Sequence, residues 1–145
     1  MPMIDIYAAA GLFRDTKRLA REAAQTVKAV EQVPDLAMFR KNTAAFVHEL
    51  PPAAIANVEG DDSYVRVQVL TNAGALTREK QVEVVRRLTD LVASAAGDPG
   101  LKERTWVLLT EAAPGGWGLW GHAHTNEDIV VAARAEIAKA SAASA

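Results

Sequence analysis

The order of elements in the first half of this chain recurs in the second half about 63 positions later. Residues 2–7 align with residues 65–70, and Gly11 aligns with Gly74. Within the segment 105–111, residues 106–111 align with residues 44–49 at an offset of 62. A repeat of this length indicates one supersecondary unit present in two diverged copies. We therefore expect a single domain built from two similar halves.

The first copy is predicted to be a strand, a helix and a strand. Residues 2–8 are almost all apolar, and Asp15 or Thr16 can cap the helix that follows. The apolar positions of that helix recur every three to four residues, at Leu19, Ala23, Val27 and Val30. Such spacing gives the helix one buried face. The second strand is expected over 44–50 because Pro51 and Pro52 follow it directly.

The second copy has the same predicted order. Its first strand begins at Val65, and Thr77 can cap a helix that ends at the segment 97–100. The apolar face of this helix is predicted to consist of Val82, Val85, Leu88, Leu91 and Val92. A strand over 105–111 completes the unit. A strand, a helix and a strand in this order form a parallel crossover unit.

These elements predict an α+β (α/β) fold in one domain, residues 1–145. The first βαβ unit spans residues 2–56, and the second unit, with a hairpin of glycines and aromatic residues at 116–121, spans residues 64–124. Residues 125–145 are expected to form a C-terminal helix and tail. We expect the tandem β-α-β repeat to form a four-stranded, mainly parallel or mixed sheet with two helices on one face.

Composition narrows the classes of function. A chain of 145 residues that is 50% hydrophobic can bury a core, and its net charge of −2 without a basic block disfavours nucleic-acid binding. The absence of cysteine excludes disulfides and thiolate metal sites. We find no apolar stretch long enough for a membrane span and no signal-peptide pattern, so a cytoplasmic protein is expected.

The second residue, Pro2, is the candidate catalytic group. Removal of Met1 would leave a secondary amine whose lone pair can take or give a proton, whereas an internal proline has none. A free terminal amine titrates near about 8, so a base at neutral pH would need burial that disfavours the cation. The alternative is that Met1-Pro2 is only a common way for a protein to begin.

Several segments resemble the tautomerase superfamily. Residues 107–113 followed by 116–121 are similar to the second strand and hairpin of 4-oxalocrotonate tautomerase, and Pro2–Gly11 is similar to its first strand. The tandem arrangement resembles cis-3-chloroacrylic acid dehalogenase, malonate semialdehyde decarboxylase and macrophage migration inhibitory factor. The resemblance covers about residues 2–124. It implies catalysis by an amino-terminal proline and assembly as a homotrimer.

The sequence also departs from the superfamily pattern. Arginines that bind carboxylate substrates in these enzymes are replaced by Leu12 in the first copy and by Asn72 and Ala75 in the second. The arginine that opens the second strand is replaced by Ala44 and Trp106. Weak or redirected activity is therefore expected.

Two further matches concern the pocket itself. The aromatic wall of the pocket is retained as Trp117, whereas the acidic and tyrosyl partners used by the dehalogenase align with leucines near Leu108 and Leu119. The water-activating groups of that enzyme are therefore missing from the matching positions.

Other polar residues have both a structural and a functional interpretation. His48 faces either the pocket or the core from a strand. His122 and His124 could share a metal, but no third ligand is indicated by spacing, so no metal site is predicted. Asp5 could share the pocket and favour a protonated amine.

Arginines near strand starts form a second group of candidates: Arg40, Arg66 and Arg104. Parallel geometry is expected to bring them toward the Pro2 end of the sheet. Solvated charge is the more common role for such residues.

The resulting hypothesis is an isomerase that moves a proton in an enol or 2-oxo acid, with Pro2 as general base and no cofactor. The substrate-binding candidates are Asn72, Trp106, Trp117, Arg40 and His48. One alternative is a non-catalytic trimeric binding protein with the same fold. Another is an enzyme that uses Pro2 as an acid in hydration, dehalogenation or decarboxylation of a small acid.

Overall fold

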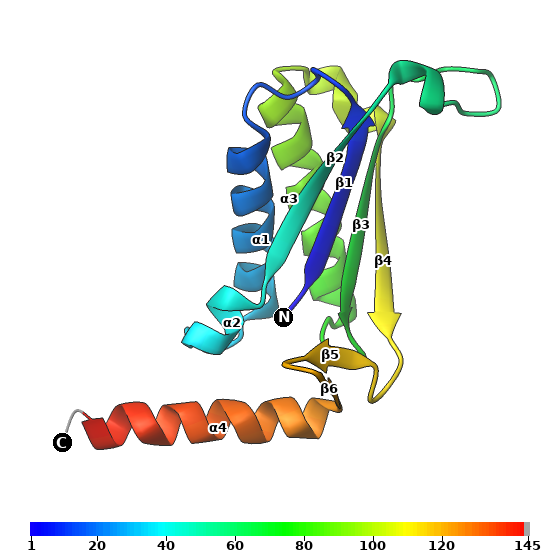
Figure 1. The fold of residues 1–145 in the computed structure, drawn as a ribbon. Coiled ribbons are helices and arrows are strands. Elements are labelled where there is room, and N and C mark those ends of the chain that lie inside the picture. The colour runs from blue at the N-terminus through cyan, green and yellow to red at the C-terminus, as the bar shows by residue number, and fades with distance from the viewer. Residues whose placement is uncertain (144–145) are drawn as a thin grey trace.

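Four strands form one mixed sheet in the order β2-β1-β3-β4. The computed structural model describes residues 1–143 of the chain, so the last two residues of the expected tail, 144 and 145, lie outside the described residues. The strands are β1 (Met3–Ala9), β2 (Ala44–Leu50), β3 (Val65–Asn72) and β4 (Thr105–Ala112). Helices α1 (Thr16–Glu31) and α3 (Arg78–Ala96) cover one face of the sheet (Figure 1). The predicted four-stranded fold with two helices on one face is confirmed.

Strand direction decides which residues meet at each end of the sheet. Strand β1 runs parallel to β2, and β3 runs parallel to β4, but β1 and β3 are antiparallel with Met3 opposite Leu70 and Tyr7 opposite Arg66. The start of β1 therefore lies beside the end of β3. The expectation that Arg66 and Arg104 lie toward the Pro2 end is wrong, because the starts of β3 and β4 are at the opposite end.

The two long helices pack as amphipathic elements over the central strands. Asp15 caps α1 by accepting a hydrogen bond from the amide of Arg18 at 2.8 Å, and Thr77 caps α3. The predicted buried positions of α1, at Leu19, Ala23, Val27 and Val30, are all buried.

One part of the α3 prediction is wrong. Val82 and Val85 are 52% and 36% exposed, whereas Val84 is fully buried together with Leu88. Positions 84, 88 and 92 recur every four residues and lie on one face, which turns Val82 and Val85 toward solvent.

The repeat is visible in equivalent contacts. The amide of Gly11 donates to the Glu49 carboxylate at 3.1 Å, and the amide of Gly74 donates to the Glu111 carboxylate at 3.0 Å. Both glycines have a positive φ, 82° and 71°, which side chains rarely tolerate. Each βα connection is thus fixed to the end of the neighbouring strand in the same way.

Shorter elements join these units: α2 (Ala37–Lys41), η1 (Pro52–Ala54), η2 (Pro99–Arg104), β5 (Trp117–Leu119) and β6 (His122–His124). Strands β5 and β6 form the predicted hairpin. Its turn residues, Trp120 and Gly121, have φ values of 53° and 78°, as in hairpin turns whose twist matches the flanking strands.

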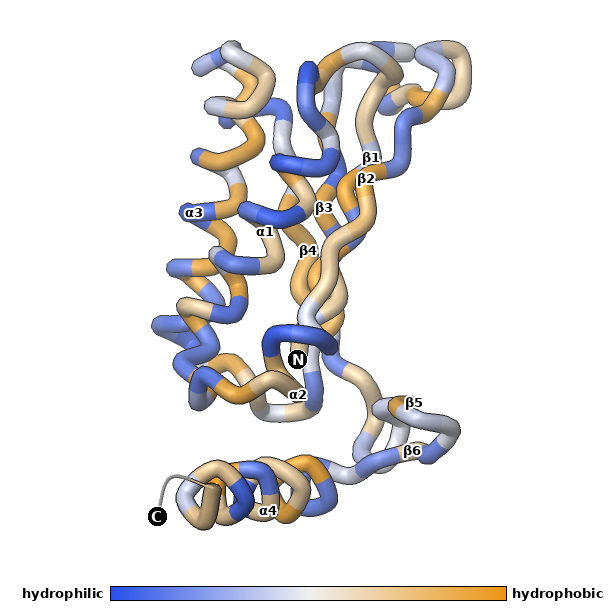
Figure 2. Tube along the Cα trace, turned by 60° about the vertical axis from the view of Figure 1, so that its left-hand side comes forward, coloured by the Kyte–Doolittle hydropathy of each residue, from blue (hydrophilic) through white to orange (hydrophobic). Residues whose placement is uncertain are grey.

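The last helix, α4 (Asn126–Ala143), lies across the end of the sheet at which the chain begins (Figures 1 and 2). Two side chains attach it to the body. Asn126 Nδ2 donates to the carbonyl of Ala73 at 2.6 Å, and the Glu136 carboxylate accepts hydrogen bonds from the amides of Ala37 and Met38 at 2.8 and 3.3 Å. Across residues 1–143, none of the helices is both long and apolar enough to cross a membrane.

The face of the sheet opposite α1 and α3 is not covered by other elements of the described chain, and it carries large apolar side chains. We call it the open face. Phe46 is 52% exposed, and Trp106 and Leu108 are each 46% exposed. Polar residues lie between them, among which Arg66 donates to Gln68 at 2.9 Å.

Candidate functional site

The amino terminus is buried at the end of the sheet covered by α4. The terminal nitrogen of Met1 lies 3.0 and 3.2 Å from the two carboxylate oxygens of Glu31. Met1 is 2% exposed, Pro2 is also buried, and the carbonyl of Pro2 accepts a hydrogen bond from the amide of Ala44 at 3.2 Å. The first peptide unit is therefore held in place on both sides.

Glu31 is the residue at this site that sequence reasoning missed. It is the last residue of α1, only 8% exposed, and its carbonyl accepts a hydrogen bond from Lys80 Nζ at 2.8 Å. A sequence signal was present, because position 31 follows Val27 by four and Ala23 by eight and so lies on the apolar face. A carboxylate at such a position needs a partner, and the terminal amine is that partner.

A cavity of about 420 Å³ adjoins this ion pair. Its wall comes from the end of α1, the connection after β3, and α4. Representative lining residues are Met1, Glu31, Phe39, Asn72, Val130 and Ile137. Most of the lining is apolar.

Two of the predicted site residues lie around this amine. Asn72 is 9% exposed and lines the cavity. Trp117 is 5% exposed and packs in the same hydrophobic cluster as Met1, Met38 and Phe39. The indole nitrogen of Trp117 is buried and has no hydrogen-bond partner among residues 1–143. A buried donor without an acceptor is costly unless a ligand supplies the acceptor.

Two other predicted residues lie elsewhere in the fold. Trp106 is at the start of β4 and stacks on Tyr64 with ring centroids 4.5 Å apart, at the end of the sheet opposite Met1. His48 is on the open face of the sheet, where its Nε2 lies 2.6 Å from an Asp5 carboxylate oxygen and its ring stacks on Tyr7. Asp5 is therefore paired with His48 on that face and is not the acid beside the terminal amine.

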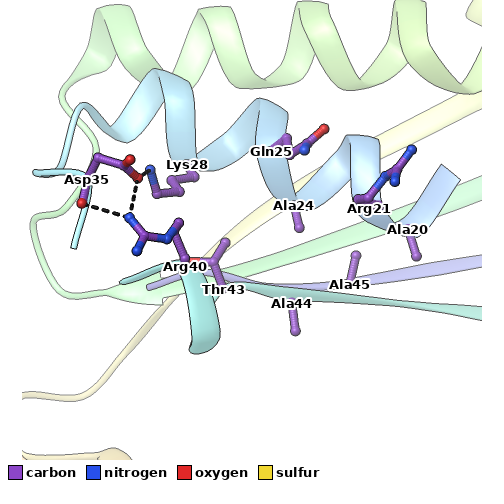
Figure 3. A pocket seen from close by; sticks show the side chains of 10 residues that line it. All are labelled: Ala20, Arg21, Ala24, Gln25, Lys28, Asp35, Arg40, Thr43, Ala44 and Ala45. Carbon is purple, nitrogen blue, oxygen red and sulfur yellow. Dashed lines mark hydrogen bonds and ion pairs between the residues drawn. The ribbon is translucent and has the colours of Figure 1, made fainter. Parts of the chain in front are cut away.

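Arg40 lies in a separate hollow of about 550 Å³ between α1 and the edge strand β2 (Figure 3). Lys28 Nζ and Arg40 Nη1 lie 3.0 and 3.1 Å from the same Asp35 oxygen. The hydrogen bond from Lys28, then that from Arg40, lowers the pKa of Asp35 below its usual value. Arg40 thus forms an ion pair at the surface. It does not line the cavity beside the terminal amine.

The histidine pair belongs to the hairpin. The rings of His122 and His124 are 6.2 Å apart, and His124 Nε2 lies 3.1 Å from the carbonyl of Leu119. Within the part of the chain that the structure describes, there is no group of three or more histidine, aspartate or glutamate side chains that could hold a metal ion.

The positions that lack the superfamily arginines can also be placed. Leu12 packs against the main core. Asn72 and Ala75 both line the cavity beside the terminal amine and Glu31, which we call the amine cavity. A different cation, Arg134 of α4, lines the same cavity. Sequence reasoning missed it, because nothing in the spacing of α4 shows that this helix folds back over the amino terminus.

Comparison with known families relates part of the chain to one enzyme family. Residues 64–126 match the family model described as "Tautomerase enzyme". No curated protein sequence matches the chain.

Solved structures match nearly the whole chain at low sequence identity. Pt0534 inactivated by 2-oxo-3-pentynoate is 19% identical with a TM-score of 0.72, over 88% of this chain and 98% of that one. N1, a member of the cis-3-chloroacrylic acid dehalogenase family, is 15% identical with a TM-score of 0.70, over 90% of each chain. The Q0 fused 4-OT, a symmetric trimer, is 16% identical with a TM-score of 0.70, over 83% of this chain and 93% of that one.

Proposed function

We propose that this chain is a member of the tautomerase superfamily, and that it is an isomerase that moves a proton within an enol or 2-oxo acid and uses the amine of Pro2 as its base. The observation that carries this proposal is the buried amino terminus beside an apolar cavity. Removal of Met1 would make the nitrogen of Pro2 the terminal amine and would free the space that the Met1 side chain fills.

The reaction needs one proton carrier. The lone pair of the Pro2 nitrogen takes the proton of the enol hydroxyl, the C–O bond becomes a carbonyl, and the electrons of the C=C bond take a proton from the protonated amine at carbon. The O–H and N–H bonds that break are matched by the N–H and C–H bonds that form. A base positioned in this way contributes about 10²- to 10⁴-fold to the rate.

Two side chains near the amino terminus are proposed to stabilise the substrate carbonyl. In this proposal the unpartnered indole N–H of Trp117, which packs in the same hydrophobic cluster as Met1, donates to the substrate oxygen, and Asn72 lines the adjoining cavity wall. Fixed donors that face developing negative charge stabilise a transition state most strongly where water is excluded.

A second candidate function is favoured by Glu31. A carboxylate beside an amine stabilises the ammonium form, and a protonated Pro2 would serve as an acid in hydration, dehalogenation or decarboxylation of a small acid. The positions that match the dehalogenase's water-activating groups are leucines, including Leu108, which is on the open face of the sheet. Proton transfer without a water nucleophile therefore remains our first proposal.

We also propose a homotrimer, as in the fused 4-OT structures described as trimers. The exposed Phe46, Trp106 and Leu108 would be covered in such an assembly. Because Trp106 lies at the far end of its own sheet, it would reach a Pro2 pocket only from a neighbouring subunit. The small-molecule site would then be completed by the partner.

The non-catalytic alternative has its own physical basis. If Met1 is retained, its ammonium group pairs with Glu31, its side chain fills the site, and the nitrogen of Pro2 is an amide without a basic lone pair. Intact-mass measurement of the purified protein distinguishes the two forms directly.

The test of catalysis is a variant with one alanine inserted between Met1 and Pro2, compared with the processed wild type on a panel of enols of 2-oxo acids. Blocking the amine should reduce turnover by at least about 100-fold, the lower end of what a positioned base contributes. Equal turnover by the two proteins would refute Pro2 as the catalyst.

A further inference from the structure

The amine cavity is lined by two charged side chains, one of each sign. Glu31 is paired with the terminal amine, but the guanidinium of Arg134 has no hydrogen bond or ion pair to the other described residues. We propose that Arg134 binds the carboxylate of the substrate, and that the site selects acids with one carboxylate and an apolar chain. This inference rests on the proposed function for its reaction but concerns binding.

Helix α4 holds Arg134 at the cavity wall. Ala133 is buried, and Val130 and Ile137, four residues before and three residues after Arg134, line the same cavity. Residues at these spacings share one side of a helix, so Arg134, which is exposed, lies on the same side of α4 as this apolar strip.

Two hydrogen-bonded attachments flank this position. Asn126 bonds to the carbonyl of Ala73 at the start of α4, and Glu136 bonds to the amides of Ala37 and Met38 two residues beyond Arg134. These contacts fix both the position of the helix along its axis and its rotation. The backbone of Arg134 is therefore held at the cavity wall, so binding an anion would have to order only its side chain.

Arg134 lies in the same cavity as two positions that lack the arginines of related enzymes. Two of the positions at which related enzymes have substrate-binding arginines are Asn72 and Ala75, and both line this cavity together with Arg134. In this proposal the positive charge comes from the C-terminal helix instead of from the end of β3. A planar guanidinium can bind a carboxylate through two parallel hydrogen bonds.

The remaining wall restricts the rest of the ligand. Val33, Phe39, Ile129 and Val130 are apolar, and the other ionisable side chain, Glu31, is an acid. A second carboxylate would have to lie against apolar surface or near Glu31, and both placements are unfavourable. An alkyl or aryl chain buries apolar area there instead.

The test measures binding of two probes with the same carbon chain, the anion 2-oxohexanoate and its uncharged methyl ester. Processed wild type, Arg134→Met and Arg134→Lys are titrated by calorimetry, with Lys139→Met as the matched control. Lys139 is the other cation of α4 and lines a different hollow beside Trp120. Methionine keeps most of the length of the arginine stem and removes its charge.

We expect Arg134→Met to raise the Kd of the acid about tenfold, the amount that corresponds to loss of one hydrogen bond to a charged group. The Kd of the ester should stay within about twofold, Arg134→Lys should recover part of the affinity, and Lys139→Met should match the wild type. Circular dichroism of each variant confirms that it is folded.

Two results would overturn the inference. One is wild-type protein that binds the acid no more tightly than the ester, and the other is an Arg134→Met variant with an unchanged acid-to-ester ratio. Turnover by the amine-blocked variant is measured separately. If blocking leaves turnover unchanged while the charge dependence at Arg134 is present, the proposed reaction fails and the binding site stands.

Discussion

The Glu31 carboxylate lies 3.0 Å from the terminal nitrogen of Met1, in a place that is nearly inaccessible to water. The site therefore combines an amine, an acid and an apolar wall. Apolar burial favours the neutral amine, whereas the carboxylate favours the ammonium form. In the proposed reaction, the balance between these two effects would decide whether the Pro2 amine takes a proton or gives one.

In the proposed form without Met1, replacing Glu31 by glutamine should lower the pKa of the Pro2 amine, because a carboxylate near an amine stabilises its cation. The measurement is a titration of protein containing nitrogen-15 proline, after intact mass has confirmed loss of Met1. If Pro2 is the base, the acidic limb of the pH profile of kcat/KM should move in the same direction.

The matched control is Glu22→Gln, because Glu22 is also on α1 but pairs with Arg18 at the surface. It should leave the pKa of Pro2 unchanged. A pKa in Glu31→Gln that equals or exceeds the wild-type value would show that Glu31 does not act on the amine.

Much of the fold follows from the repeat. Because Gly11 aligns with Gly74 and Glu49 with Glu111, the sequence predicted two equivalent units, and the structure gives both pairs the same hydrogen bond. Hydrophobic spacing likewise predicted the buried face of α1 correctly. Such features depend on local periodicity, which one sequence contains.

Long-range placement could not be obtained in the same way. The antiparallel pairing of β1 with β3 puts Trp106 and Arg66 at the end of the sheet opposite Pro2, and no local pattern specifies that pairing. The same limit applies to α4. Arg134 lies 62 residues from Asn72 in the sequence, and only the folded chain brings both to one cavity.

The corrected face of α3 can be tested by two alanine substitutions. Leu88→Ala should lower the free energy of unfolding by about 3 kcal/mol, since the side chain is fully buried and its removal leaves a cavity. Val85→Ala, at a position that is 36% exposed, should cost less than about 1 kcal/mol. Denaturant unfolding at one fixed protein concentration compares them, and equal losses would contradict the observed orientation of α3.

The proposed trimer predicts a solution mass of about three times 15.5 kDa. Phe46→Glu places a charge on the open face of the sheet, where it costs little in a single subunit but would be buried between subunits. Sedimentation should therefore show this variant shifted to monomer. Val58→Glu, at a fully exposed loop position, serves as the control and should remain trimeric. A wild-type monomer would refute the assembly and the role of Trp106 in a neighbour's site.

The acid dependence of stability should include a contribution from Glu83 on α3. Hydrogen bonds from Arg86, first, and from Arg87 lower the pKa of Glu83 to about 2. A carboxylate whose pKa is lower in the folded state stabilises that state above its unfolded pKa, near 4.5, and loses this effect as pH falls toward 2.

Glu83→Gln should therefore be less stable than the wild type at pH 7, and the difference should shrink between pH 4.5 and pH 2. Because Glu83 and its partners are at the surface, the difference at pH 7 should be small and should decrease further in 1 M salt, where the Debye length is only about 3 Å. The control is Glu103→Gln, at an exposed position in η2. Its thermal melting curve should follow the wild type across the same pH range, and a loss in Glu83→Gln that does not depend on pH would point to altered helix packing rather than to the ion pairs.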